Sequence, residues 1–242
     1  MTEAPLLEPG AAAPSGGWRR AVVREVLRPA PRAVVLRLDV ADRVDHVPGQ
    51  HYVVRLTAED GYSASRSYSV ASPPSDPLVE LYVERLDDGE VSSYLADVVE
   101  VGDELEVRGP IGGWFAWDGV SRALAVGGGT GVVPLVSMLR HARAAGHPER
   151  VCLVAAGRTL VDLPYAAEIQ GGCDLVVLSR EDSPAGRPAG RLSAADLAPY
   201  VEGHDVVFVC GSAVFAEATS QLLVSLGVPT TAIRVERFGP SG

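Results

Sequence analysis

The chain has no lysine and no asparagine among its 242 residues, so all 21 basic residues are arginine. Without lysine, the protein has neither a Schiff-base catalyst nor the phosphate-binding lysine of a P-loop. Acidic residues number 31, and the formal net charge is −10. This balance argues against nucleic acid as a partner, because phosphate backbones bind to basic surfaces.

Cysteine is also scarce, with only Cys152, Cys173 and Cys210 in the sequence. Three cysteines are too few for a four-cysteine iron–sulfur cluster, and no pair has zinc or redox-motif spacing, so no metal site is predicted. No apolar run reaches the roughly 20 residues of a membrane-spanning helix, and no membrane partner is expected. The N-terminal stretch lacks the basic start and apolar segment of a secretory signal. The few scattered cysteines favour a cytoplasmic setting with reduced thiols.

The segments that are present divide the chain into two halves with different patterns. Residues 1–17 are rich in proline, glycine and alanine and are predicted to form a flexible tail. From residue 18 to 119, short alternating apolar segments are separated by turns such as Asp60-Gly61, which is typical of an antiparallel β-barrel. The expected elements are strands over 32–40, 51–62, 65–72, 78–89 and 103–113, with a short helix over 92–99.

From residue 120 to 242, apolar strands alternate with helices, which indicates a parallel sheet covered on both faces. The expected strands are 122–128, 150–157, 173–181, 204–212 and 232–238, and the expected helices are 132–146, 162–169, 192–201 and 213–227. Ser193 and Asp196 have the spacing of a helix capping box. The sequence therefore predicts two domains, a β-barrel followed by an α/β domain.

A glycine turn formed by Gly129, Thr130 and Gly131 joins the first strand of the second half to a helix. Backbone N–H groups at a helix start attract anions, and glycine lets a pyrophosphate approach closely. The spacing departs from the common G-x-G-x-x-G pattern, because Pro134 stands where the third glycine is expected. A tight turn without a ligand is the alternative interpretation.

Arginines follow the next two strands of this half, at Arg158, Arg180, Arg187 and Arg191. At these strand ends, guanidinium groups favour a nucleotide 2′-phosphate, and hence NADP(H) over NAD(H). Ordinary solvated loop arginines are the alternative.

Two later strands supply further candidates. Cys210 ends a central strand, where open α/β sheets bind ligands, although a buried structural cysteine has the same pattern. Glu236 and Phe238 are two residues apart in the last strand and share one face.

The barrel half has a polar segment that suits a flavin. Arg66 offers a cation for a phosphate, Tyr68 a flat partner for the ring, and Ser69 a hydrogen-bond donor. Strand alternation places Arg66 and Tyr68 on one side and Ser69 on the other, so a strand end or twist is needed to bring them to one ligand. The helix start at Val91, Ser92 and Ser93 offers N–H groups and hydroxyls to a pyrophosphate.

Four motifs in this order resemble the ferredoxin–NADP reductase family. "RSYS" resembles its R-x-Y-S flavin motif, "GGTGVVP" its G-G-T-G-x-x-P motif, "VCGS" its Cys-Gly motif, and "VERF" its C-terminal stretch. The resemblance covers residue 18 to the end of the chain. It implies a flavin-binding β-barrel domain followed by an NADP-binding α/β domain, with FAD and NADP(H) as cofactors.

The family motifs imply a role for each matching residue. Arg66 would contact the flavin phosphate, Tyr68 and Ser69 the isoalloxazine ring, and Ser92 and Ser93 the pyrophosphate. The nucleotide would be held by Gly129, Thr130, Gly131, Arg158 and Arg180, with Cys210 and Glu236 beside the nicotinamide and Phe238 on the flavin. Ser67, Val91, Arg187 and Gly211 complete the predicted set, within which Ser69, Cys210 and Glu236 are expected to be catalytic.

The resemblance implies that hydride passes from NADPH to FAD and that electrons then leave to a separate ferredoxin, flavodoxin or haem protein. Two alternatives stay open: an NADH-dependent reductase of free flavin or another small molecule, and a flavin- or nucleotide-binding module without turnover. A docking patch for the acceptor could lie on Arg19, Arg20, Arg24, Arg28 and Arg32, or these arginines could simply form a solvated strand face.

Overall fold

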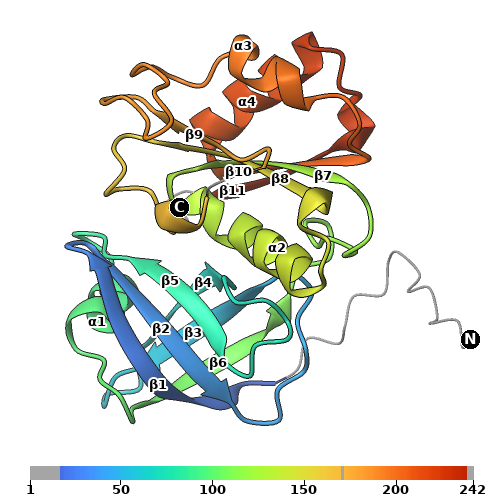
Figure 1. Cartoon of the computed structure of the whole chain (residues 1–242). Helices are drawn as coiled ribbons and strands as arrows, with labels where there is room; N and C mark the ends of the chain where they lie inside the picture. The colour runs from blue at the N-terminus through green and yellow to red at the C-terminus, as the bar shows by residue number, and fades with distance from the viewer. Residues whose placement is uncertain (1–16, 170–171, 239–242) are drawn as a thin grey trace, which may run out of the picture.

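The computed structural model describes residues 17–169 and 172–238. Figure 1 shows two lobes: an antiparallel barrel formed by the first half of the chain and a parallel sheet with helices formed by the second. The two-domain fold expected from the sequence is confirmed. Residues 1–16 of the predicted tail lie outside the described residues.

The barrel is a six-stranded sheet in the order β4-β3-β6-β1-β2-β5, with every neighbouring pair antiparallel. Its strands are β1 (Arg19–Ala30), β2 (Ala33–Val40), β3 (His51–Thr57), β4 (Ser63–Ser69), β5 (Val79–Glu84) and β6 (Glu104–Ile111). The edge strands β4 and β5 are joined at an isolated bridge between Val70 and Leu81. Helix α1 (Glu90–Asp97) packs against both edges, and apolar side chains such as Leu36 and Tyr52 fill the barrel.

The second sheet is parallel and five-stranded, in the order β11-β10-β7-β8-β9. Its strands are β7 (Ala123–Gly128), β8 (Val151–Gly157), β9 (Leu175–Leu178), β10 (Val206–Ser212) and β11 (Ile233–Phe238). Helix α2 (Val133–Ala144) lies between this sheet and the barrel, whereas α3 (Ala194–Leu197) and α4 (Ala213–Ser225) cover the far face (Figure 1). Because both faces are covered, β7 and β10 are almost entirely buried and apolar.

Short 3₁₀ turns connect several of these elements. They are η1 (Gly129–Val132), η2 (Pro148–Arg150), η3 (Ala166–Glu168), η4 (Ala198–Tyr200) and η5 (Thr230–Ala232). The helix predicted over 162–169 is wrong, since only η3 forms there. Pro164 disfavours a helical residue before it, and Tyr165 adopts a left-handed conformation with φ of 56°.

Two further differences separate the expected elements from the observed ones. Strand β1 was not among the strands assigned from alternation, because the charged residues of "RRAVVREVLRPA" obscure it, although its arginines were considered as a strand face. The helix predicted over 192–201 is shorter, being α3 followed by η4. Its capping box is confirmed: the Ser193 hydroxyl accepts from the Asp196 N–H, and the Asp196 carboxylate accepts from the Ser193 N–H at 2.8 Å.

Helix α2 is hydrogen-bonded to the barrel as well as packed on its own sheet. The Ser137 hydroxyl donates to the Ser72 carbonyl at 2.8 Å, and the Arg140 guanidinium donates to the Ala71 carbonyl at 3.1 Å. At the edge of the parallel sheet, Arg234 of β11 donates to the Ala116 carbonyl at 2.9 Å. Within residues 17–169 and 172–238, no helix is both long and apolar enough to span a bilayer.

Candidate active site

The polar end of β4 lies at an edge of the six-stranded sheet, next to the bridge between Val70 and Leu81. Arg66 is exposed, Tyr68 is partly buried against the barrel core, and Ser69 is buried at the strand end opposite His51. The strand end that the alternation required is therefore present at Ser69. The Arg66 guanidinium donates to the Ser65 carbonyl at 2.8 Å and has no acidic partner in the described part of the chain.

Two hydroxyls at this edge are buried without a hydrogen-bond partner among residues 17–169 and 172–238: the Tyr68 Oη and the Ser69 Oγ. Burial raises the pKa of Tyr68, so its hydroxyl stays protonated and able to donate. Buried polar groups in folded proteins almost always have partners, so these two hydroxyls are suited to bind a ligand or a water molecule at this edge.

The start of α1 offers backbone N–H groups to a ligand, because the hydroxyls of Ser92 and Ser93 already bond to the loop before the helix. The Ser92 hydroxyl accepts from the Leu86 N–H and donates to the Gly89 carbonyl, both at 3.2 Å, and the Ser93 hydroxyl donates to the Leu86 carbonyl at 3.1 Å. These bonds shape the loop that enters the helix, while Val91 is buried in the barrel core. No side chain caps the first turn, so its N–H groups are available to an anion.

The glycine turn packs directly on the end of β10. A Cβ at Gly131 would lie 2.2 Å from the Cys210 carbonyl oxygen, and one at Gly128 would lie 2.7 Å from the Phe215 ring. A Cβ at Gly129 would meet nothing within 4 Å, and this residue has a φ of +55°. The turn and the Cys-Gly segment therefore form one site, with Gly129 bordering open space.

Phe215 belongs to this site and was missed at the sequence level. A Cβ on Gly211 would also meet its ring, at 2.7 Å, so the phenylalanine lies against both glycine segments. A single phenylalanine in an amphipathic helix is usually a core residue, and nothing in the pattern distinguished this one.

Cys210 and Glu236 are paired residues of the neighbouring strands β10 and β11. Burial, with a further contribution from the Glu236 charge, raises the pKa of the Cys210 thiol, which is fully buried. Burial also raises the pKa of Glu236 to about 6. The Glu236 Oε2 has no hydrogen-bond partner in the described part of the chain, and Phe238 packs at the end of the same strand against the core beside the barrel.

The predicted phosphate-binding arginines have two different environments. Arg158 and Arg180 are exposed and adjacent, with the Arg180 N–H donating to the Arg158 carbonyl at 3.0 Å. Neither side chain forms an ion pair within residues 17–169 and 172–238, so both are available to a phosphate.

Arg187 is not available in this way. Its guanidinium makes five hydrogen bonds, two to the Asp196 carboxylate and three to the carbonyls of Pro188, Gly190 and Arg191. All five N–H donors of an arginine are then used, and this environment does not favour the predicted role of Arg187 in cofactor binding.

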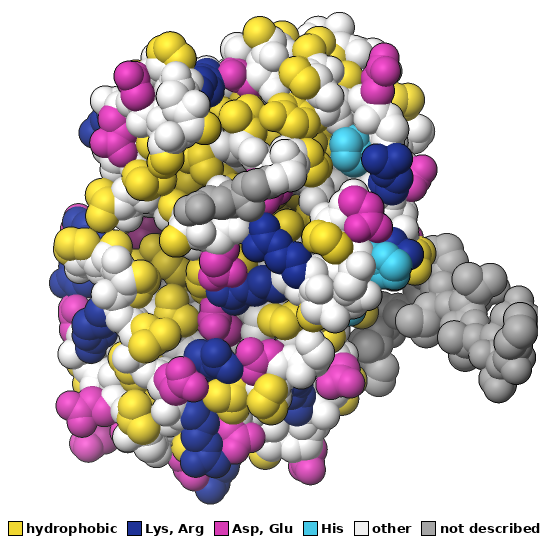
Figure 2. Space-filling view, in the orientation of Figure 1, with side chains coloured by type: hydrophobic (Ala, Val, Ile, Leu, Met, Phe, Trp, Pro, Cys, Tyr) yellow, Lys and Arg dark blue, Asp and Glu magenta, His cyan; other side chains and the backbone are white. Residues whose placement is uncertain are grey.

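Three of the five arginines near the N-terminal strand have acidic partners, and Arg19 and Arg28 bond to the carbonyls of Asp42 and Ala96. Arg20 pairs with Glu104, Arg24 with Asp39 and Arg32 with Asp87. Figure 2 shows the same mixing, with basic and acidic side chains side by side over the barrel and hydrophobic ones gathered where the two lobes meet.

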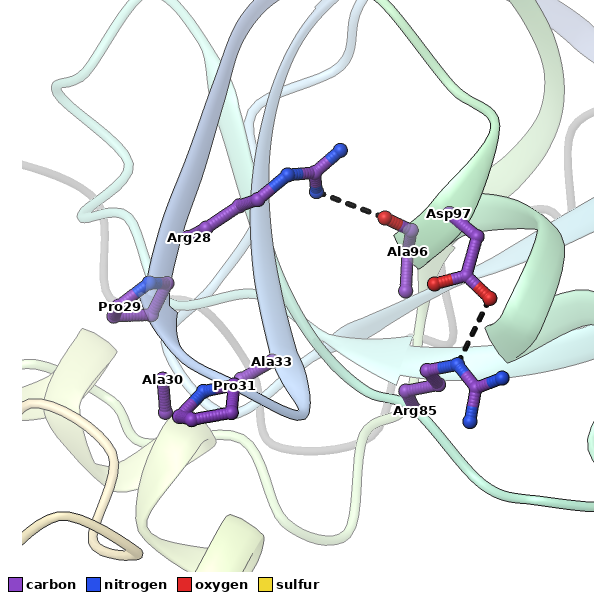
Figure 3. Close-up of a pocket in the computed structure, with 8 residues that line it drawn as sticks. All are labelled: Arg28, Pro29, Ala30, Pro31, Ala33, Arg85, Ala96 and Asp97. Carbon is purple, nitrogen blue, oxygen red and sulfur yellow. Dashed lines mark hydrogen bonds and ion pairs between the residues drawn. The ribbon is translucent and has the colours of Figure 1, made fainter.

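A cavity of about 570 Å³ lies at the β1–β2 hairpin and the C-terminal end of α1, away from these residues. Figure 3 shows Arg28 bonded to the Ala96 carbonyl and Arg85 to Asp97 around it. None of the predicted site residues lines this cavity.

These features define a two-domain nucleotide-dependent flavoprotein fold, and comparisons with known proteins agree. Residues 22–115 match the family described as Oxidoreductase FAD-binding domain. The chain is 31% identical over 206 residues, covering 83% of this chain and 58% of the relative, to a 3-ketosteroid-9-alpha-monooxygenase, ferredoxin reductase component, of Rhodococcus rhodochrous. It is 29% identical over 218 residues, 86% of this chain and 65% of the relative, to the ferredoxin–NAD(P)(+) reductase component of naphthalene dioxygenase and salicylate hydroxylase systems of a Ralstonia species.

Among solved structures, the FAD/NAD-binding domain of nitric oxide dioxygenase from Vibrio cholerae matches with a TM-score of 0.82 and 25% identity, covering 92% of this chain and 99% of that one. The chain is therefore similar to ferredoxin reductase components over most of its length, and residues 22–115 match the FAD-binding oxidoreductase domain. It spans less than two thirds of the length of the two curated relatives named above.

The residues present fit FAD, which confirms the cofactor expected from the motifs. The fit rests on three observations of this structure. Tyr68 and Ser69 have unpaired buried hydroxyls, Arg66 is a cation without an acidic partner in the described part of the chain, and α1 begins without a side-chain cap. Each meets a need of a flavin dinucleotide: a donor to the ring, a counter-charge and N–H groups for the pyrophosphate.

Proposed function

We propose that this chain is an NADPH-dependent FAD-containing reductase that passes electrons to a separate redox protein. The observation that carries the proposal is that each half keeps buried, unpaired polar groups at its motif residues, namely Tyr68 and Ser69 in the barrel and Glu236 in the parallel sheet. FAD, when bound, supplies the redox chemistry by accepting a hydride and releasing electrons.

The chain's own residues bind and orient the two cofactors. On the barrel side, Arg66 neutralises the flavin phosphate and Ser69 donates to the ring. On the other side, the Gly129–Val132 turn receives the nucleotide pyrophosphate, and Arg158 and Arg180 bind the 2′-phosphate.

Cys210 and Glu236 stand beside the nicotinamide in this proposal. Burial raises the pKa of the Cys210 thiol and keeps it protonated. The side chain therefore offers a small, uncharged contact surface. Burial raises the pKa of Glu236 to about 6, so its carboxyl takes up a proton below that pH.

The acceptor class follows from the relatives. Two of them are named as ferredoxin reductase components of oxygenase systems. We propose a ferredoxin or a comparable small redox protein as acceptor, with a flavodoxin or haem protein as further candidates. A cytoplasmic location is part of the same proposal, supported by the free thiols of Cys152, Cys173 and Cys210.

The test is spectroscopic. The purified protein should be yellow, and anaerobic NADPH should bleach it faster than NADH at equal concentration. The reduced protein is then mixed with ferredoxin, flavodoxin and haem-protein acceptors, and reduction of each is followed by absorbance. A colourless protein that takes up no FAD would refute the proposal, and equal bleaching by both nucleotides would refute the NADPH preference.

A further inference from the structure

Four side chains form a buried polar cluster where the two lobes meet, here called the Arg140 cluster: Arg140 of α2, Glu80 of β5, and Tyr165 and Glu168 of the segment around η3. One Glu80 oxygen, Oε1, accepts from both the Arg140 guanidinium and the Tyr165 hydroxyl, each at 2.8 Å. Arg140 also binds both carboxylate oxygens of Glu168, at 2.8 and 2.6 Å. The guanidinium carbon lies 4.6 Å from the centre of the Tyr165 ring.

Charge in this cluster is buried to different degrees. The Glu80 side chain is 8% exposed, that of Arg140 19% and that of Glu168 37%. Burial alone would lower the pKa of Arg140, but hydrogen bonds to Glu168 and Glu80 outweigh it and raise the pKa. A buried ion pair is costly to break from one side, because the remaining charge is left without a partner.

The cluster also connects the two half-sites along the chain. Helix α2 begins directly after the Gly129–Val132 turn, and Ser137 and Arg140 lie on one face of it. Both bond to the backbone of the barrel, at the carbonyls of Ser72 and Ala71. Ala71 and Ser72 lie two and three residues after Ser69. Helix α2 and these two hydrogen bonds therefore link the Gly129–Val132 turn to the segment that carries the Ser69 hydroxyl.

We propose that Arg140 is a positioning residue, which fixes the nucleotide half-site relative to the flavin half-site through Glu80, Tyr165 and the Ala71 carbonyl. The proposal rests on the proposed function. In this proposal Arg140 contacts neither cofactor, and its role is to keep the hydride donor and acceptor at reacting distance. Displacing reacting groups by about 1 Å can slow a reaction by about 100-fold.

The experiment compares four variants of the full chain loaded with FAD. Arg140→Leu removes the two bonds from α2 to Glu80 and to the Ala71 carbonyl and leaves the bond from Tyr165 to Glu80. Arg140→Lys keeps the charge without the paired contacts to Glu168. Tyr165→Phe removes one hydroxyl and keeps the ring. The matched control is Arg143→Leu, because Arg143 lies on the same helix but bonds only within the nucleotide half, to Asp174 and the Glu168 carbonyl.

The hydride-transfer rate and the NADPH dissociation constant are measured separately by rapid mixing. Arg140→Leu should slow hydride transfer by about 10- to 100-fold while the dissociation constant changes less than about threefold. Tyr165→Phe should show a smaller loss of rate, Arg140→Lys should recover part of it, and Arg143→Leu should keep the wild-type rate. Wild-type rates in both Arg140→Leu and Tyr165→Phe would overturn the proposal.

A second readout does not depend on turnover. Hydrogen–deuterium exchange over residues 70–84 should rise in Arg140→Leu and stay unchanged in Arg143→Leu, even if both lose stability. Equal exchange over 70–84 in these two variants would overturn the positioning role. A wild-type protein that binds FAD but is reduced by neither nucleotide would overturn the proposed function, and with it the effect on hydride transfer. The exchange experiment would then still test the contact between the halves.

Discussion

Cys210 and Glu236 are paired across the parallel strands β10 and β11, and the carboxylate oxygen Oε2 of Glu236 has no partner among residues 17–169 and 172–238. The two side chains therefore place an acid and a thiol side by side, with burial disfavouring charge on both.

The first prediction concerns the pH dependence of stability. Burial raises the pKa of Glu236 from 4.5 to about 6, so the folded protein holds this proton more tightly than the unfolded chain. The stabilising contribution is complete below pH 4.5 and is lost as the pH rises through about 6. Glu236→Gln should therefore raise the free energy of unfolding at pH 7.5 by about 1–2 kcal/mol, with little gain near pH 4.5.

Urea denaturation at a series of pH values checks this prediction. Glu59→Gln serves as the control, because Glu59 is exposed in the β3–β4 turn. A gain for Glu236→Gln that is the same at every pH would show that burial of the charge is not its cause.

The second prediction concerns the glycine turn. Gly131→Ala should lower the free energy of unfolding by about 3 kcal/mol or more, because its Cβ would overlap the Cys210 carbonyl, a backbone atom that cannot swing away. Gly129→Ala should cost only about 1 kcal/mol, since it meets no atom and suffers only from its left-handed conformation. Thermal and urea denaturation of both variants measure the difference, and equal losses would contradict the packing argument.

The third prediction separates the arginines that follow the sheet. Arg180→Ala should raise KM for NADPH about tenfold or more with little change for NADH, since a 2′-phosphate is the only group that differs. Steady-state rates with both nucleotides test this, and equal effects on the two would refute it.

Arg187→Ala is the matched comparison for Arg180→Ala. Because Arg187 is bound to Asp196 and three carbonyls, its loss should lower stability by about 1–3 kcal/mol without changing the ratio of the two KM values. The Arg187 guanidinium also lowers the pKa of Asp196 to about 2. A change in nucleotide preference for this variant would restore its predicted role in cofactor binding.

The fourth prediction concerns Ser69. Its hydroxyl is buried and bonds to nothing in the described part of the chain, so Ser69→Ala should leave stability without FAD unchanged or raise it by about 1 kcal/mol. The rate of FAD reduction should nevertheless fall, by about 10- to 100-fold, if this hydroxyl donates to the flavin ring. Ser65→Ala, on an exposed part of the same strand, provides the control. A loss of stability without a loss of rate would assign Ser69 a packing role.

Much of the fold was readable from the sequence because its signals are local. Apolar runs such as "ALAV" and "VVFVC" indicated buried parallel strands, and the Ser193–Asp196 spacing gave a helix start that the structure confirms. The failures have local causes as well. Arginines and a glutamate in β1 interrupted its alternation, and Tyr165 turned left-handed where a helix was expected.

The residues of the candidate site also fall into two groups, those that the sequence indicated and those that only the structure revealed. Motif spacing selected Arg66, Ser69, Gly131 and Glu236, because glycine and polar residues in a strand pattern stand out in a linear sequence. Their partners did not stand out. Phe215 against the glycine turn and Glu80 beneath Arg140 are ordinary residues of a helix and a strand, and they acquire meaning only from what packs against them.

The sequence by itself determined the resemblance to ferredoxin–NADP reductases, the order of the two halves and the residues that carry the cofactor motifs, since these depend on composition and short-range spacing. Only the tertiary structure decided which arginines are free. Arg180 and Arg187 are equivalent in the linear pattern, yet folding places Asp196 against one and leaves the other without an ion pair in the described part of the chain. It also placed β4 at an edge of its sheet, because edges are set by long-range strand pairing that no local pattern encodes.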